Sequence, residues 1–271
     1  MNTNESLTCE ACGFGSLEPF NPSEQVSYMF CSKCLLYQKG RAFSSEYYKE
    51  DYHENYKKAK NRKLRKASYR LRVLSCLLTS PEKRVLDVGC SLGYTVEAGA
   101  KAGWKTSGVD VCEDVVNECK RRGLDCQKID SIALPYSDNQ FDALTAWHVI
   151  EHLSDVKSVL REWLRVLKPG GVLAIEAPDA SSPKVRKRQG RYRKFWKIDH
   201  VYVFSPASLK KILEDTGFEV VQVPSLRDLW KRRAVTGSVL FYKGFEKVRK
   251  RLGINKEFII YARKPDNLNP K

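Results

Sequence analysis

The strongest constraint on the fold is the alternation of short, β-branched runs with helix-like segments that begins after Pro81. Strands separated by helices of this length form βαβ units, in which the strands run parallel and helices cover both faces of the sheet. We therefore expect an α/β domain built on a mostly parallel sheet. The expected strands are 84–90, 105–110, 126–130, 141–147, 172–177, 219–223 and 258–262, with helices at 95–102, 113–122, 156–166 and 206–216.

Composition places the chain among globular proteins without a membrane span. Of its 271 residues 42% are hydrophobic, which is enough to bury a core. No stretch approaches the roughly 20 consecutive apolar residues that a membrane-spanning helix needs. The first ten residues are polar and lack the apolar segment of a secretory signal, so we expect a cytoplasmic protein.

The composition changes near residues 40 and 80, which divides the chain into three parts. Residues 1–40 hold two cysteine pairs among Gly, Pro and Ser and show no helical period. Residues 41–80 are rich in Tyr and Lys and end in a helix with a basic face, so we interpret them as a basic helical connector. Residues 81–271 form the α/β domain, with a basic insertion at 224–256 between its last two strands.

The cysteine pairs of the first part have the spacing of a metal site. Each C-x2-C pair can place two thiolates on one side of a tight knuckle, and two knuckles close a tetrahedral Zn²⁺ site without an open position, which indicates a structural zinc ribbon. The alternative is four unrelated surface cysteines. The expected ligands are Cys9, Cys12, Cys31 and Cys34, whereas the scattered Cys76, Cys90, Cys112, Cys119 and Cys126 are expected to be small buried hydrophobic residues.

A glycine-rich turn follows the first strand of the α/β domain. In VLDVGCSLGY, residues 85–94, Gly89 and Gly93 allow the backbone to approach a ligand closely, and the following helix N-terminus offers unpaired N–H groups. Asp110 ends the second strand 21 residues after Gly89, where an acidic side chain can bind ribose hydroxyls. Asp130 ends the third strand. The alternative is a turn of the same shape that binds no nucleotide.

The segment VLDVGCSLGY resembles the first motif of class I S-adenosylmethionine-dependent methyltransferases. Further segments follow in the order of that family, although Ser91 and Leu92 stand where many members carry Gly. The resemblance covers residues 80–223 and implies a Rossmann-like, seven-stranded sheet whose last strand is antiparallel. The matching segments are GVD at 108–110, ID at 129–130, FDALTAWHVIEHLSD at 141–155 and LRVLKPGGVLAIEAPD at 164–179.

The resemblance also implies which residues bind S-adenosylmethionine. The turn would surround the methionine part, and the ends of the next strands would hold the nucleoside. The implied residues are Asp87, Gly89, Cys90 and Gly93 around the methionine moiety, Asp110 at the ribose, Asp130 and Ser131 at the adenine, and Trp147 and His148 at the end of the fourth strand.

The segment WHVIEHL places two histidines four residues apart with Glu151 between them. On a helix, His148 and His152 would share a face. In one interpretation His148 touches the cofactor while Glu151 and His152 support the turn. In the other, one of them removes the acceptor's proton, because an imidazole near its ordinary pKa is a suitable general base.

A further histidine, His200, lies in RKFWKIDHVYVFSP. The segment resembles, in its H-x-x-x-F-S part, a pattern that follows the fifth strand in ubiquinone-type and polysaccharide-cluster methyltransferases, where this loop faces the acceptor. The resemblance makes His200 and Asp199 candidates for acceptor contact or for the general base. The alternative is a histidine that only fastens the loop to the sheet.

The formal net charge of +16 indicates a polyanionic partner. Much of the excess lies in clusters at 57–72, 184–197 and 227–251, although ordinary solvated faces could account for each. We expect a small-molecule or lipid-linked acceptor, such as a phosphate-bearing intermediate, and the third cluster could lie on an anionic membrane surface. RNA is the alternative acceptor, and a cofactor-binding module without catalysis is the alternative function.

Overall fold

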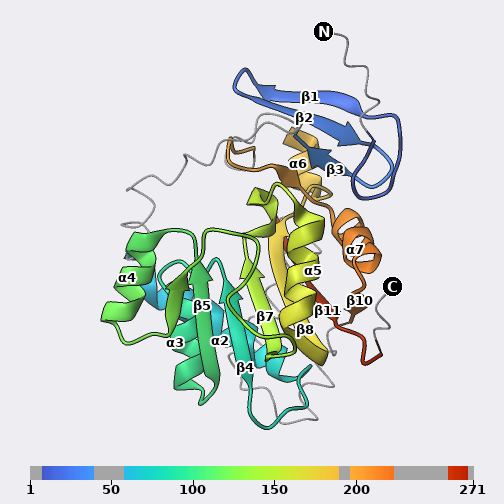
Figure 1. Ribbon diagram of the computed structural model, residues 1–271. Coiled ribbons are helices and arrows are strands. Elements are labelled where there is room, and N and C mark those ends of the chain that lie inside the picture. Colours follow the sequence, from blue (N-terminus) through green and yellow to red (C-terminus); the bar gives the residue numbers. More distant parts are fainter. Residues whose placement is uncertain (1–7, 40–57, 189–195, 223–255, 268–271) are drawn as a thin grey trace.

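The computed structural model describes residues 8–39, 58–188, 196–222 and 256–267. They form two sheets, a large one with helices on both faces and a small one at the N-terminal end (Figure 1). None of the described helices is long and apolar enough to cross a bilayer. The expected insertion at 224–256 lies outside the described residues except for Lys256, as does most of the third basic cluster.

The large sheet confirms the expected Rossmann-like topology. Its strand order is β10-β11-β8-β7-β4-β5-β6, and only β11 runs antiparallel to its neighbours. The strands are β4 (Arg84–Val88), β5 (Lys105–Asp110), β6 (Cys126–Lys128), β7 (Phe141–Trp147), β8 (Leu167–Pro178), β10 (Glu219–Val221) and β11 (Glu257–Arg263). Because β4 has β5 on one side and β7 on the other, the strand order reverses there, and open α/β sheets bind ligands at the carboxyl ends of the strands beside such a point.

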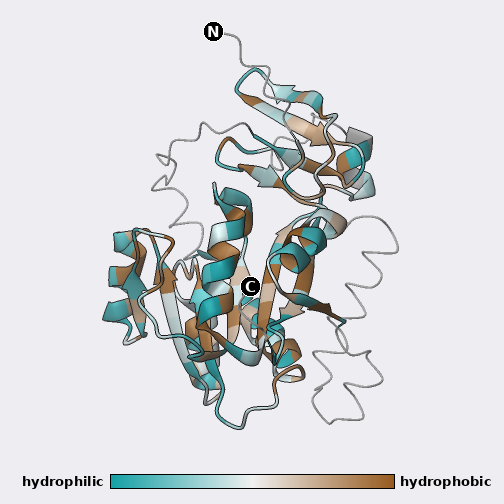
Figure 2. Ribbon diagram, turned by 45° about the vertical axis from the view of Figure 1, so that its right-hand side comes forward, coloured by the Kyte–Doolittle hydropathy of each residue, from teal (hydrophilic) through white to brown (hydrophobic). Residues whose placement is uncertain are grey.

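Four helices match or approach the expected ranges, and a fifth, α2 (Lys60–Ser75), is the helix expected in the basic connector. The four are α3 (Tyr94–Lys101), α4 (Glu113–Arg121), α5 (Val156–Val166) and α7 (Pro206–Asp215). In β8, Leu173 and Ile175 join an apolar cluster with α5 and α7, whereas Val172 and Ala174 join one with α2. The apolar residues of the central strands therefore face helices on both sides. The hydropathy colouring shows that these strands are largely hydrophobic (Figure 2).

Several strand ends differ from the sequence prediction, because β4, β6 and β10 end earlier than expected and β8 and β11 are longer. The strand β8 begins at Leu167 rather than 172, because the K-P-G-G segment is already extended and paired, with Leu167 opposite Phe141 of β7. The strand β6 ends at Lys128, so Asp130 lies two residues beyond its end.

The small sheet is not confined to residues 1–40. Its order is β1-β2-β3-β9, and β9 (Tyr202–Val203) comes from the segment after β8. The other strands are β1 (Glu18–Ser23), β2 (Val26–Cys31) and β3 (Leu36–Gln38). Tyr28, Trp196 and Val203 share one buried cluster, so the N-terminal part folds onto the loop that carries His200.

Candidate active site

The glycine-rich turn is tightly constrained at the carboxyl end of β4. Gly89 and Gly93 both have φ of 66°, which only glycine adopts without strain. A Cβ on Gly89 would lie 2.4 Å from Cγ2 of Val149, and Gly93 caps the N-terminus of α3. The glycines therefore let the turn pack tightly on Val149 and enter α3, whose N-terminus no side chain caps, so its first N–H groups can meet a ligand.

Two buried carboxylates flank this turn. Asp110 accepts hydrogen bonds from the backbone N–H of Ser91 at 2.7 Å and of Cys112 at 3.0 Å. Asp87, inside β4, accepts one from Thr145 at 2.5 Å. Burial raises the pKa of Asp110 and raises that of Asp87 to about 7. Hydrogen bonds thus hold each carboxylate in a fixed position, while burial removes the water that would otherwise solvate its charge.

Exposed apolar side chains lie beside these polar groups. Val111 follows Asp110 and is 53% exposed, and Ile132 follows Ser131 and is 45% exposed. They are two of the three large hydrophobic residues exposed in the described part of the chain. Since β5 and β6 are parallel neighbours, both lie at one edge, where they can contact a flat apolar ligand. The sequence analysis did not predict these two residues. An apolar residue close behind an acidic residue at the end of a strand would have indicated them as ligand contacts.

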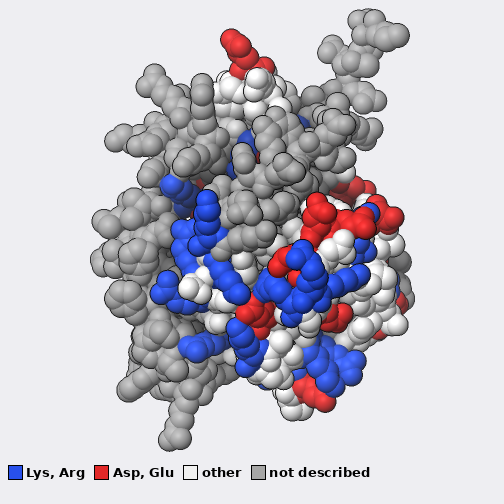
Figure 3. Space-filling model, turned by 90° about the vertical axis from the view of Figure 1, so that its left-hand side faces the viewer, with Lys and Arg blue, Asp and Glu red and all other residues white. Residues whose placement is uncertain are grey.

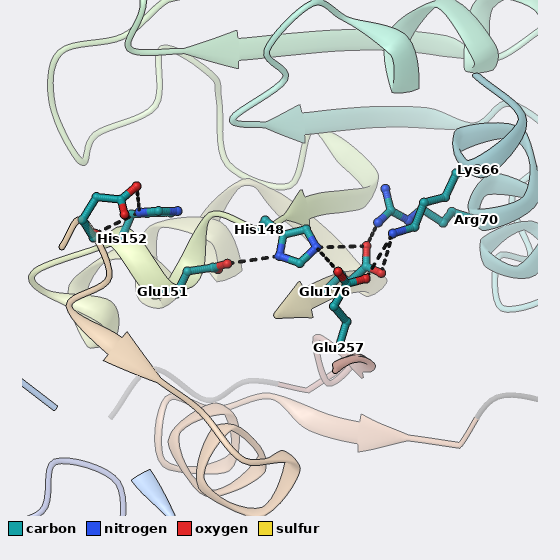
Figure 4. A network of polar contacts seen from close by, with 8 residues as sticks. Lys66, Arg70, His148, Glu151, His152, Glu176 and Glu257 are labelled. Carbon is teal, nitrogen blue, oxygen red and sulfur yellow. Dashed lines mark hydrogen bonds and ion pairs between the residues drawn. The ribbon is translucent and has the colours of Figure 1, made fainter. Parts of the chain in front are cut away.

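A second group of polar residues lies at the ends of β7 and β8. His148 has φ of 60°, and its backbone N–H donates to the carbonyl of Glu176 at 2.9 Å. Its Nδ1 lies 3.2 Å from Oε1 of Glu151, which is buried in the 3-10 turn Ile150–His152 (Figure 4). The His148 side chain is 35% exposed, so it can be reached by a substrate.

The opposite side of His148 faces two more carboxylates. Its Nε2 lies 3.8 Å from Glu176 and 3.7 Å from Glu257. Lys66 and Arg70 reach across from α2 to Glu176, and Lys66 also lies 3.4 Å from Glu257 (Figure 4). The sequence analysis placed both cations in a basic cluster that faces a polyanionic partner or solvent, and it did not identify Glu176 or Glu257 as site residues.

This network determines the protonation of His148. Burial disfavours the imidazolium, but the carboxylates of Glu151 and Glu257 outweigh it, so the pKa of His148 is raised. His148 in turn lowers the pKa of Glu257. Trp147, expected to line the cofactor, lies under the Arg70 guanidinium at 4.1 Å from its ring centre.

The expectation that His148 and His152 share a helical face is wrong. The left-handed backbone at His148 precedes the short 3-10 turn, so the two side chains point in opposite directions (Figure 4). His152 donates from Nδ1 to the carbonyl of Asp199 at 2.9 Å, and its ring packs against that of His200. His200 itself is 3% exposed, and burial lowers its pKa to about 2.

The four N-terminal cysteines converge as their spacing predicts. Their sulfur atoms all lie within 4.8 Å of one another, with Cys9 and Cys34 3.5 Å apart and Cys12 and Cys31 3.6 Å apart. Each knuckle is followed by a residue of positive φ, Gly13 at 70° and Leu35 at 57°. Four sulfurs around tetrahedral Zn²⁺ would be separated by about 3.8 Å, so the geometry fits this metal.

The candidate residues therefore form two neighbouring groups. The glycine-turn half comprises Asp87, Gly89, Cys90, Gly93 and Asp110 with Val111, Asp130, Ser131 and Ile132. The histidine half comprises His148, Glu151, Glu176, Glu257, Lys66 and Arg70. They adjoin because β4 and β7 pair in parallel, with Asp87 opposite Thr145.

Known proteins share this architecture. A family profile described as a methyltransferase domain matches residues 52–223. The chain is 37% identical over 109 residues to a demethylmenaquinone methyltransferase of Renibacterium salmoninarum, covering 40% of this chain and 46% of that protein. It is 28% identical over 180 residues to a ubiquinone biosynthesis O-methyltransferase of Xanthomonas axonopodis, covering 61% and 75%.

A solved structure agrees at the level of the fold. A SAM-dependent methyltransferase from Archaeoglobus fulgidus superposes with a TM-score of 0.53 at 24% identity and covers 74% of this chain and 94% of its own. Since the family match spans more than half of the residues and includes the glycine turn and both strand-end groups, the chain belongs to the class I S-adenosylmethionine-dependent methyltransferases.

Proposed function

We propose that this protein transfers a methyl group from S-adenosylmethionine to a hydroxyl oxygen of a small quinone-type acceptor, free or carried on a lipid. The observation that carries the proposal is the oriented His148–Glu151 pair, directly beside the glycine turn on the adjoining strand. The relatives named above act in quinone biosynthesis by their names, which favours this acceptor class over RNA.

The glycine-turn half has the features required to hold the methyl donor. The bound cofactor supplies an electrophilic methyl group on a sulfonium. We assign Asp87, Gly89, Cys90 and Gly93 to its methionine part, because they form the turn between β4 and the uncapped N-terminus of α3. Asp110, fixed by two backbone N–H groups, would accept from the ribose hydroxyls. The adenine would lie at Asp130 and Ser131, with Val111 and Ile132 against its faces.

The histidine half supplies a candidate general base. Glu151 accepts from Nδ1–H of His148 and fixes the ring, which leaves Nε2 to take the acceptor's proton. The carboxylates of Glu176 and Glu257 would stabilise the imidazolium so formed. Lys66 and Arg70 balance their charge.

We assign His200 a positioning role rather than that of the base. It is almost fully buried and its low pKa keeps it neutral, so it is poorly placed to receive a proton from a substrate. Its backbone carbonyl accepts from the Tyr28 hydroxyl at 3.1 Å, which fastens the loop to the N-terminal sheet. Asp199 would act through His152, whose Nδ1 lies 3.4 Å from its carboxylate.

The four-cysteine cluster is proposed to bind a structural Zn²⁺. Its four thiolates leave no coordination position for a substrate. The Ser205 hydroxyl donates to the carbonyl of Cys34 at 2.5 Å, and Lys39 N–H donates to the carbonyl of Val201 at 2.9 Å. The metal would therefore also hold the acceptor-side loop in place.

A basic face could attract an acceptor that carries phosphate. Lys and Arg side chains gather along α2, whereas α3 and α4 on the same side of the molecule carry acidic residues among their cations (Figure 3). One hollow of this surface is lined by Lys58, which precedes α2, and by Arg62 and Arg65 of α2. Anionic lipid headgroups are one partner for such a face, because several cations lie on one helix that also reaches the histidine half.

The test is product formation with labelled S-adenosylmethionine. We expect radiolabel in hydroxylated aromatic quinone precursors, with stoichiometric release of S-adenosylhomocysteine, and none in total RNA. The matched variants are His148→Gln and His152→Gln, of which the first should lower turnover far more than the second. Label in RNA with a steep salt dependence of binding would reject the proposed acceptor, and cofactor binding without any turnover would favour a non-catalytic module.

A further inference from the structure

A second cysteine cluster lies behind the glycine turn. Cys90 belongs to the turn, Cys119 to α4 and Cys126 to the first position of β6. Their sulfur atoms all lie within 4.8 Å of one another, and Cys90 and Cys126 are 3.9 Å apart. All three side chains are at most 5% exposed, and they share one buried apolar cluster with Val96, Val116 and Leu124.

The neighbouring backbone leaves space for these sulfurs. A Cβ on Gly108 would lie 2.8 Å from Sγ of Cys90 and 3.0 Å from Sγ of Cys126. A Cβ on Gly93 would lie 2.9 Å from Sγ of Cys119. A larger residue at Gly93 or Gly108 would displace a sulfur atom. Two glycines in different parts of the fold therefore leave the space that the three sulfurs occupy.

The cluster has the geometry of a three-coordinate thiolate site. Metal–sulfur bonds of about 2.3 Å in a trigonal plane separate the sulfurs by about 4.0 Å, close to the observed 3.9 Å. Zn²⁺ prefers four ligands, and the group of ligating side chains here contains three. Soft thiolates without a fourth donor instead suit Cu(I).

A cation lies near the cluster. The guanidinium of Arg122 acts electrostatically on Cys119. Arg122 is itself held by the carbonyl of Leu92 and by Glu97. A positive charge is therefore fixed beside the cluster, which would offset the excess negative charge of a thiolate complex.

We propose that Cys90, Cys119 and Cys126 form a binding site for one thiophilic cation of the Cu(I) class, in trigonal coordination. Each metal–sulfur bond forms as the corresponding thiol proton is released to solvent. The ion links the glycine turn to α4 and β6. The site is separate from the four-cysteine cluster, and it shares Cys90 with the residues proposed to hold the methionine part of the cofactor.

The test is an anaerobic titration of the full-length, zinc-loaded protein with Cu(I), supplied as its acetonitrile complex, against a chromogenic Cu(I) chelator. We expect one equivalent of Cu(I) to bind without release of zinc. Cys119→Ala and Cys126→Ala should each weaken this binding at least 100-fold, whereas Cys76→Ala, which removes a thiol outside the cluster, should not. Equal binding by all variants, or zinc release matching copper uptake, would overturn the proposal.

A second measurement does not depend on the variants. X-ray absorption of the wild-type complex should show three sulfur atoms in the first shell of the copper. A shell of two sulfurs, or one with nitrogen donors, would be incompatible with the site. Zinc content and S-adenosylhomocysteine binding of each variant serve as folding controls, and a variant that fails them is replaced by its Ser counterpart.

Discussion

The two halves of the candidate site are built differently. The core of the glycine-turn half comes from one ten-residue segment and the end of the next strand. The histidine half brings together side chains from α2, β7, the 3-10 turn, β8 and β11, and its Lys66–Glu257 pair is 191 residues apart. Binding of the cofactor thus depends on local backbone shape, whereas the proposed proton transfer depends on the packing of distant elements.

Their electrostatics also differ. Asp87 and Asp110 are buried beside backbone donors and a hydroxyl, and burial raises the pKa of each. In the histidine half, anions and cations are paired, so the pKa of His148 is raised and that of Glu257 is lowered. The first half therefore holds its carboxylates with backbone and hydroxyl donors, whereas the second half holds its ionisable groups by pairing opposite charges. Four experiments can separate the halves.

The largest effect is expected from removing the metal. A structural Zn²⁺ contributes on the order of 10 kcal/mol to the folding of its module. In a Cys9→Ser, Cys12→Ser double variant, the zinc should be lost and β9 should lose its partner strand. Misplacement of the acceptor-side loop should lower turnover about 100-fold, with S-adenosylhomocysteine affinity nearly unchanged.

Zinc analysis and calorimetry check this outcome, with Cys76→Ser as the control. A double variant that retains one equivalent of metal would contradict the four-thiolate site. Loss of cofactor binding would show that the halves are not separable.

Replacing the proposed base should affect only the histidine half. Loss of a general base lowers kcat by about 10²–10⁴-fold, so His148→Gln should do the same. Single-turnover experiments measure the rate of methyl transfer. The matched control is His152→Gln, because His152 lies on the other side of the 3-10 turn. Similar rates for the two variants would mean that His148 is not the base.

Replacing the ribose ligand should affect only the glycine-turn half. Asp110→Ala removes a buried, charge-assisted acceptor, which should weaken cofactor binding by about 1–3 kcal/mol. Asp130→Ala, at an exposed position, should cost less than about 1 kcal/mol. Calorimetry measures the affinity of each variant for S-adenosylhomocysteine. Equal affinities of the wild type and Asp110→Ala would refute Asp110 as the ribose ligand.

The smallest effect is a pH dependence specific to the histidine half. Because the pKa of His148 is raised, its basic form is gained only as pH rises through a value above the ordinary 6.5, and kcat should rise there. The free energy of unfolding should change in the opposite direction. Protonated His148 pairs with its carboxylates, and this contribution to stability is complete below pH 6.5. It is lost as the pH rises through the raised pKa of His148. The kcat profile of wild type should show this acidic limb, and the limb should be absent from His148→Gln.

Much of the glycine-turn half was predictable. The strand over 105–110 matches β5, and Asp110 lies at its end as expected. The turn glycines adopt the positive φ that a tight approach to a ligand requires. These features depend on neighbours along the chain, so periodicity and spacing reveal them.

For the histidine half, the sequence predicted two of the site residues but not how their side chains are arranged. His148 and Glu151 were candidates, but the left-handed backbone at His148 reversed the expected direction of its side chain. Arg70 was counted as part of a basic face, yet it is 8% exposed and pairs with Glu176. Nothing in the local pattern around Arg70 distinguishes a cation that reaches a buried carboxylate from one in solvent.

The two cysteine clusters show the division most simply. The sequence alone determined the first, because two C-x2-C pairs form their knuckles locally and need only one hairpin to meet. Only the tertiary structure decided the second, along with the charges around His148. Cys90, Cys119 and Cys126 become neighbours because parallel strands and their crossover helix pack side by side, and such packing follows from long-range burial that no short motif records.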